Sequence, residues 1–182
     1  VAALGALAVA GNHDLIALGR LPADQCTAFA AESLVWTAAA IGEATRRALD
    51  ALPPTAARDG IVVAHGSLDD PRAYVETPAL VAGELARLRA RAPDARLLVL
   101  GHTHRPVVAD AAGRTLAARA PARVALADGP VLLNPGSVGQ PRGADPRARA
   151  AIVDLARGEI ELHAIAWDVD AVRADLRARG RP

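Results

Sequence analysis

Three short apolar runs in this sequence each end abruptly at a polar cluster that contains histidine. The runs occupy residues 6–10, 61–64 and 97–100, and the clusters that follow them are Asn12-His13-Asp14, His65 and His102-Thr103-His104. Runs of this length and composition predict buried strands of an α/β fold. Ligands bind at the carboxyl ends of the strands in an open parallel sheet. We therefore expect the clusters to meet in one small pocket, although they lie far apart in the sequence.

Residues 1–10 also resemble the hydrophobic part of a secretory signal, because they end in an Ala-Val-Ala cleavage pattern. No basic segment precedes them, however, and the strand-then-cluster pattern follows directly. We interpret residues 1–10 as a buried strand.

The segment from residue 22 to about residue 50 has helical composition with few breakers. We predict two helices there, one around 28–32 and one around 34–41, ended by Pro53-Pro54. A further helix is predicted to begin with Thr77 as N-cap and Pro78 in its first turn. Its apolar face carries Val81, Leu85 and Leu88.

After residue 105 the pattern changes to short strands and turns. We predict strands at 106–108, 124–127, 131–133, 150–155 and 160–166, a mobile hairpin or loop at 109–122, and a terminal helix at 169–179.

The composition is that of one soluble globular domain spanning residues 1–182, with 52% hydrophobic and 23% charged residues. The formal net charge is +1 and aromatic residues make up 2%, which argues against long nucleic acid as a partner. No apolar run is long enough to span a bilayer, so we expect no membrane partner. Cys26 is the only cysteine, which excludes an intrachain disulfide and favours a cytoplasmic location.

The residue types of the three clusters suit a divalent transition metal. Neutral imidazole nitrogens bind zinc, iron, nickel or manganese, and an Asn carbonyl oxygen can complete a mixed shell. Four of the five histidines lie at the predicted strand ends. His102 and His104 would point to the same side of an extended strand, or reach two neighbouring metals from a loop. The three clusters together predict a metal site.

Individual residues have simpler interpretations. His65 alone would be a hydrogen-bonded residue at a strand end, and Asp14 either carries charge near the site or caps a helix. His163 lies on the exposed face of a predicted strand, and Cys26 packs within a helix-like stretch. Arg142 is either a surface arginine or a bidentate ligand of a substrate phosphate.

Four blocks of the sequence carry more specific motifs, namely GNHD (11–14), VVAHGS (62–67), GHTHRP (101–106) and NPGSVGQPR (134–142). Together they resemble the calcineurin-like metallophosphoesterases, in particular a small bacterial phosphodiesterase-like branch. The resemblance covers essentially the whole chain. It implies a four-layer α/β/β/α sandwich with a two-metal centre between the sheets.

The resemblance also implies roles for residues of the pocket. Asn12, His65 and His102 would bind one divalent ion and His104 the other, the ions being Mn, Fe, Zn or Ni. A metal-bridged hydroxide would attack the phosphoester in line, and His13 would act as general acid at the leaving group. The block 134–137 has turn chemistry, and we expect it to position the loop of His102 from behind.

The sequence departs from this family in one respect. Family members begin with a strand ending in Asp-x-His and a later strand ending in Gly-Asp, which supply three further ligands, including the aspartate that bridges both metals. Neither motif occurs in this chain, which also has no methionine. We therefore expect an N-terminally truncated chain, a mostly inactive fragment of a metal-dependent phosphoester hydrolase.

A second function is open on the same fold, that of a non-catalytic scaffold or interaction module. The retained Asn12, His13, His65, His102 and His104 favour the enzyme. The chemistry suits a small phosphoester or nucleotide substrate. Cyclic nucleotides, dinucleoside polyphosphates, phosphoproteins and nucleic-acid ends all remain possible substrates. The sequence does not determine the oligomeric state.

Overall fold

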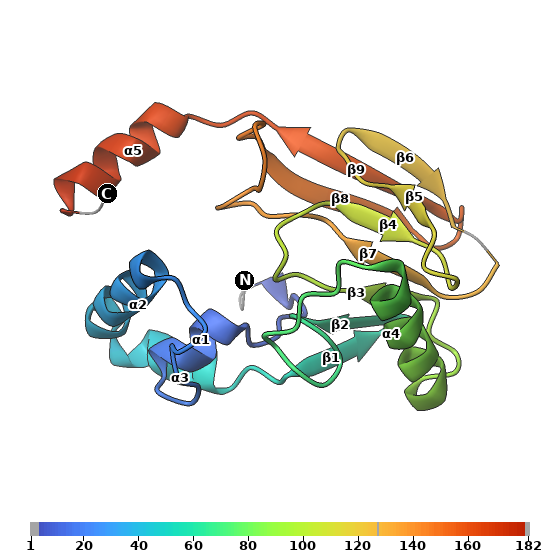
Figure 1. Cartoon of the computed structure of the whole chain (residues 1–182), viewed down its shortest axis with the longest axis horizontal. Helices are drawn as coiled ribbons and strands as arrows, with labels where there is room; N and C mark the ends of the chain where they lie inside the picture. Colours follow the sequence, from blue (N-terminus) through green and yellow to red (C-terminus); the bar gives the residue numbers. More distant parts are fainter. Residues whose placement is uncertain (1–3, 127, 181–182) are drawn as a thin grey trace.

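A computed structural model describes residues 4–126 and 128–180 and contains two stacked β-sheets flanked by helices (Figure 1). The larger sheet has the strand order β1 (Thr55–Arg58), β2 (Ile61–Ala64), β3 (Leu97–Val99), β7 (Val131–Asn134), β4 (Val107–Ala109) and β5 (Thr115–Ala117). Its central strands β2, β3 and β7 are parallel, whereas β1, β4 and β5 pair antiparallel with their neighbours. The carboxyl ends of β2 and β3 therefore lie side by side, as the sequence predicts.

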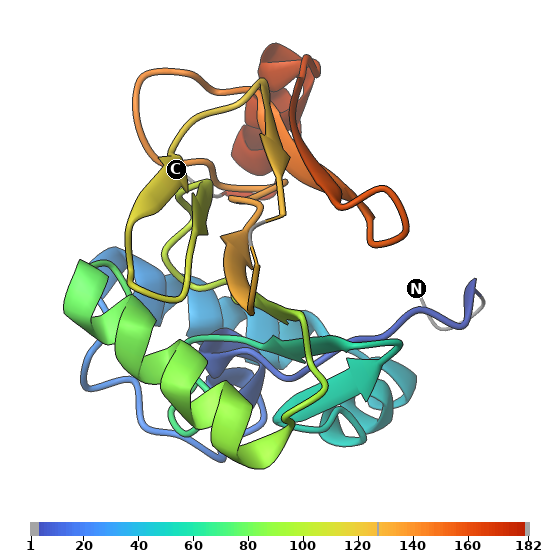
Figure 2. The same ribbon diagram turned by 90° about the vertical axis from the view of Figure 1, so that its right-hand side faces the viewer.

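The smaller sheet consists of β6 (Ala122–Ala125), β9 (Glu159–Ile165) and β8 (Ala148–Asp154), all antiparallel. It packs on the larger sheet (Figure 2). Ile160 and Leu162 alternate with Glu161 and His163 along β9, so the apolar side chains face the larger sheet and His163 lies on the other face, as predicted. The core between the sheets is formed by fully buried side chains of Leu97, Val108, Val131, Leu133, Ile160 and Leu162.

Helix α4 (Pro78–Arg91) packs on the larger sheet through a second core. It begins where the sequence predicts, because the Thr77 hydroxyl accepts a hydrogen bond from the first turn and Pro78 lies in that turn. The predicted apolar face is buried together with sheet residues, the contacts being made by Val81, Leu85, Leu88, Leu98 and Leu132.

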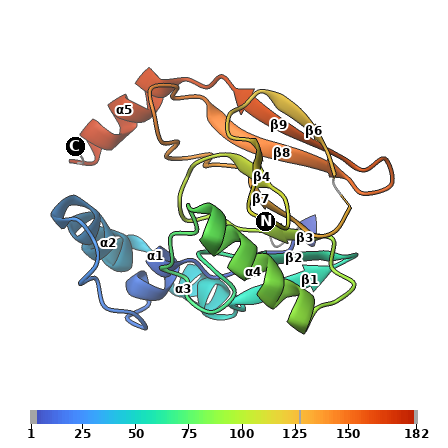
Figure 3. The same cartoon turned by 45° about the vertical axis from the view of Figure 1, so that its right-hand side comes forward.

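Three further helices gather near the carboxyl ends of β2 and β3, namely α1 (Asn12–Ala17), α2 (Ala28–Ala40) and α3 (Glu43–Asp50) (Figure 1). The last helix, α5 (Val169–Ala178), follows β9, and none of its residues is buried (Figure 3). The mixed α/β sandwich expected from the sequence is confirmed. Among the residues described here, no helix combines the length and apolar character needed to cross a membrane.

Two predictions for the first fifty residues are wrong. Residues 6–10 form no strand, because a strand needs a ladder with a neighbour and this segment is held by one backbone bond, from the Ala10 N–H to the Pro53 carbonyl (3.0 Å). Residues 1–3 of that predicted strand lie outside the described part. The helical region divides at Ile41 and Gly42, which are extended, whereas nothing between residues 32 and 34 interrupts α2.

The later predictions agree more closely with the structure. The strands predicted at 106–108, 131–133, 150–155 and 160–166 are β4, β7, β8 and β9, with ends shifted by one or two residues. The one predicted at 124–127 is β6, although residue 127 lies outside the described part. The segment 109–122 forms a hairpin, because β5 pairs with β4.

Candidate metal centre

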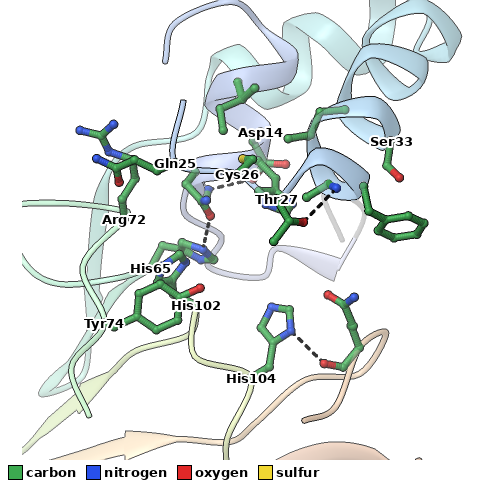
Figure 4. Close-up of a pocket in the computed structure, with 18 of the residues that line it drawn as sticks. Asp14, Gln25, Cys26, Thr27, Ser33, His65, Arg72, Tyr74, His102 and His104 are labelled. Atoms are coloured by element: carbon green, nitrogen blue, oxygen red, sulfur yellow. Dashed lines mark hydrogen bonds between the residues drawn. The ribbon is translucent and has the colours of Figure 1, made fainter. Parts of the chain in front are cut away.

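One pocket of about 800 Å³ is lined by all the residues that the sequence singles out, namely Asn12, His13, His65, His102 and His104 (Figure 4). Asn12 and His13 form the first turn of α1, His65 follows β2, and the other two histidines follow β3. The structure therefore brings the three histidine-containing clusters together in one pocket. The chemical role of each residue remains a prediction.

The start of α1 is organised by a carboxylate. The Asp14 Oδ2 atom accepts a hydrogen bond from the Gly11 N–H (2.8 Å), which satisfies a backbone donor ahead of the helix. Of the two interpretations of Asp14, the hydrogen bond to Gly11 supports the one in which Asp14 caps the helix. Asn12 is buried, whereas His13 is exposed to the pocket and solvent.

The His65 imidazole lies in a narrow slot and contacts Asn12. A Cβ atom on Gly11 would lie 3.1 Å from His65 Cε1, and one on Gly101 would lie 3.4 Å from Nδ1, so little room remains beside the ring. His65 Nε2 donates a hydrogen bond to Asn12 Oδ1 at 3.0 Å. This bond agrees with the simpler interpretation of His65, and it also places two predicted ligands in contact.

Burial lowers the pKa of His65 from its ordinary value of 6.5 to about 4, with nearby His102 adding to the shift and Asp14 opposing it. Between these two pH values the unfolded chain binds a proton that the folded chain does not bind. We therefore predict that, in chelator, the free energy of unfolding decreases as the pH falls through this window. The His65 ring proton should titrate in NMR spectra with a midpoint near 4; a midpoint at the ordinary value would contradict this account.

The loop after β3 holds two histidines in left-handed backbone conformations. The φ angles are +61° at His102 and +59° at His104. Such angles are uncommon and unfavourable for residues other than glycine, and they concentrate at functional sites. The two histidines therefore lie on a loop, which excludes the alternative of an extended strand with both side chains on one side.

The two imidazoles of this loop have different surroundings. The His102 ring packs against Tyr74 with centroids 4.2 Å apart, and its Nε2 atom is buried without a hydrogen-bond partner in the described part of the chain. His104 Nδ1 donates to the Gln140 carbonyl (2.8 Å), which leaves Nε2 as the unprotonated nitrogen of the neutral ring. Burial is the main cause that lowers the pKa of both histidines, so both rings are mainly neutral at pH 7.

Asn134 holds this loop from behind, which confirms the role expected for the block 134–137. Its side chain is 2% exposed, and Nδ2 donates to the Gly101 carbonyl (2.5 Å) and to the Thr103 hydroxyl (3.1 Å). Its Oδ1 atom accepts from the Gly136 N–H (2.9 Å). One buried amide thus connects the end of β7 to the loop that carries His102 and His104.

Replacing Asn134 is expected to destabilise the protein. Asn134→Ala removes both hydrogen bonds donated by Nδ2 and leaves the half-buried Gly136 N–H without its acceptor, so we expect the free energy of unfolding to fall by about 3 kcal/mol. Asn134→Asp keeps the size and the acceptor but removes both donated bonds, and should cost a similar amount. Urea unfolding measures both. An aspartate variant with the midpoint of the unchanged protein would contradict the assigned role.

The donor atoms of the pocket fit a divalent transition metal. Three mainly neutral imidazoles and an amide oxygen are suitable ligands, although His65 Nε2 and Asn12 Oδ1 bond to each other in this structure and would have to exchange that bond for an ion. The His102 Nε2 atom is buried without a partner among the described residues, so its lone pair is available to a cation. The shell is incomplete, because no three His, Cys, Asp or Glu side chains in the described ranges converge tightly enough to hold a metal. Asp14 is the single carboxylate among the described lining residues, and Gly11 already engages it.

Other residues of the pocket were not found from the sequence. Tyr74 and the Gln140 carbonyl contact the two histidines of the loop, and only Gln140 carried a signal, since it lies in the block 134–142. The predicted location of Cys26 in a helix is wrong, because it lies before α2, ahead of the capping Thr27. Its half-buried free thiol lines the pocket. Arg142 is exposed and also lines the pocket.

Comparison with known proteins finds one relative by sequence and two solved structures with a similar fold. The chain is 27% identical over 171 residues to the uncharacterized protein MJ0912 of Methanocaldococcus jannaschii, covering 91% of this chain and 67% of that protein. A metallophosphoesterase from Sphaerobacter thermophilus superposes with a TM-score of 0.79 at 27% identity, over 96% of this chain and 71% of the other. Hypothetical protein PH1004 from Pyrococcus horikoshii OT3 shares the fold, with a TM-score of 0.74 at 14% identity over 96% and 68% of the two chains.

The sequence also matches the calcineurin-like phosphoesterase superfamily domain over residues 1–158. This match contains all three clusters of the pocket, of which two follow the strands β2 and β3 and the third, in the GNHD block, begins α1. Because the match covers most of the chain, the protein belongs to the calcineurin-like phosphoesterase superfamily.

Proposed function

We propose that this protein is a hydrolase of phosphoesters, with phosphodiesters of small molecules or nucleotides as substrates and two divalent metal ions as cofactors. The observation that carries the proposal is the pocket in which Asn12, His65, His102 and His104 meet, with His102 Nε2 buried and unpartnered within the described residues. Membership of the calcineurin-like phosphoesterase superfamily supports it.

In this proposal Asn12, His65 and His102 would hold one ion and His104 would hold the other. Manganese, iron, zinc and nickel all suit these donors. When bound, such ions neutralise phosphate oxygens and lower the pKa of an attacking water. The protein contributes the orientation of the rings: the Gln140 carbonyl keeps the proton of His104 on Nδ1, and Asn134 fixes the loop that carries His102.

His13 is proposed to give a proton to the leaving-group oxygen. It lines the same pocket as His65 and His102, and its exposed side chain is not held by another residue in the described ranges. Arg142 is proposed to orient the substrate phosphate, because it lines the pocket and forms no ion pair with a described residue. Its guanidinium can offer two parallel hydrogen bonds to a phosphate.

We also propose that residues 1–182 alone hydrolyse phosphodiesters only weakly, because the pocket has no unengaged carboxylate to bridge two ions. The free thiol of Cys26 supports a cytoplasmic location. The test compares this chain with the gene product expressed from its natural start codon, using bis-p-nitrophenyl phosphate with and without Mn²⁺. We expect strong metal-dependent hydrolysis by the gene product and little by residues 1–182.

Equal activity of the two proteins would overturn the proposal about the missing carboxylate. A gene product that binds two metal ions and hydrolyses none of a broad panel of phosphoesters would replace the hydrolase with the scaffold function.

A further inference from the structure

The wall of the pocket opposite the histidines is formed by one face of α2. Phe29, Ser33 and Thr37 recur at intervals of four residues and all line the pocket, together with Ala30 and Leu34. Figure 4 shows Ser33 and Thr27 on the other side of the pocket from His65 and Tyr74. The pocket thus has a side with metal-type donors and an opposite side that mixes apolar side chains with the hydroxyl groups of Ser33 and Thr37.

Phe29 stands out on this wall because aromatic residues are scarce in the chain. The sequence contains two Trp, one Tyr and one Phe, and two of these four aromatic residues line this pocket. Phe29 is 53% exposed and Tyr74 is 51% exposed. A solvent-exposed aromatic side chain on the wall of a concave pocket is available to pack against a ligand. Aromatic rings pack favourably against other aromatic rings, in stacked or edge-to-face arrangements.

We propose that Phe29 selects phosphoesters whose organic group is planar and aromatic over esters whose organic group is compact and aliphatic. This inference rests on the proposed function, which places the phosphoryl group at the histidine side. The organic group of the ester then extends toward α2, where the half-exposed side chain of Phe29 lines the pocket. The Ser33 hydroxyl makes no hydrogen bond to another described residue and is free to meet a polar edge of the aromatic group.

The test measures binding with two phosphonates that share a phosphoryl head and resist hydrolysis. Phenylphosphonate and methylphosphonate are titrated into the natural gene product in Mn²⁺, and Kd is measured by calorimetry. We expect phenylphosphonate to bind about tenfold more tightly. Phe29→Ala should reduce this preference to about twofold or less without changing the Kd of methylphosphonate, and Phe29→Trp should keep the preference.

Val35→Ala is the matched control, because Val35 is an exposed apolar residue of the same helix that does not line the pocket. It should leave both dissociation constants unchanged. A preference that survives in Phe29→Ala, or an equal weakening of both phosphonates, would overturn the inference while leaving the proposed function intact. If neither phosphonate binds in Mn²⁺, the inference and the proposed function both fail.

A second copy of the chain covering Phe29 would also overturn the inference. Sedimentation velocity distinguishes this case, because a dimer that dissociates in Phe29→Ala would show that the ring serves association. We expect the same sedimentation coefficient for the variant and the unchanged protein.

Discussion

In the natural gene product, His102→Ala is expected to lose bound metal and phosphodiester hydrolysis together. The His102 Nε2 atom is buried without a hydrogen-bond partner among the described residues, as His163 Nε2 also is, but only the His102 ring lies in the pocket, with its centroid 5.1 Å from that of His65. Removing a side chain that coordinates an ion lowers metal affinity. Hydrolysis then falls because the bound ions neutralise the charge on the phosphate oxygens. Metal content by mass spectrometry and hydrolysis of bis-p-nitrophenyl phosphate measure the two losses.

His163→Ala is the matched control for this substitution. His163 lies on β9, on the face away from the core between the sheets, and does not line the pocket. It should keep metal content and activity. A His102→Ala variant that retains its metal while losing activity would contradict the role of this residue as a ligand.

His13→Ala should lower kcat by roughly 10²- to 10⁴-fold in the same gene product while leaving the metal content unchanged. The side chain is exposed in the pocket and is not among the proposed metal ligands. A proton donor matters most when the leaving group is a strong base. The defect should therefore be larger for an alkyl leaving group than for p-nitrophenolate.

Two outcomes would exclude this role of His13. One is a loss of metal in His13→Ala, which would make it a ligand. The other is a defect of the same size for both leaving groups, which would point to positioning of the substrate rather than proton transfer.

The parts of the structure that the sequence predicts well are those with strong local signals. Thr77 and Pro78 define the start of α4, and the spacing of Val81, Leu85 and Leu88 defines the face it buries. Apolar runs followed by histidines locate β2 and β3 together with the loops at their carboxyl ends. Parallel pairing then brings those loops into one pocket without any signal from the intervening sequence.

Features that depend on tertiary contacts could not be predicted in this way. Residues 6–10 have the composition of a strand, but pairing requires a neighbour that composition does not reveal. Tyr74 contacts His102 from a segment without regular structure, and Phe29 lines the pocket because α2 packs against α1. The left-handed angles at His102 and His104 likewise have no signature in the sequence, because neither residue is a glycine.

Anomalous diffraction from crystals of the gene product grown with Zn²⁺ tests whether the pocket is a metal centre. We expect anomalous peaks in the pocket, one within roughly 2.0–2.1 Å of His102 Nε2 and another at the same distance from His104 Nε2. Asn12 and His65 should contact the first peak. Zinc bound elsewhere on the protein, with this pocket empty at saturating metal, would contradict the assignment of these residues as a metal centre.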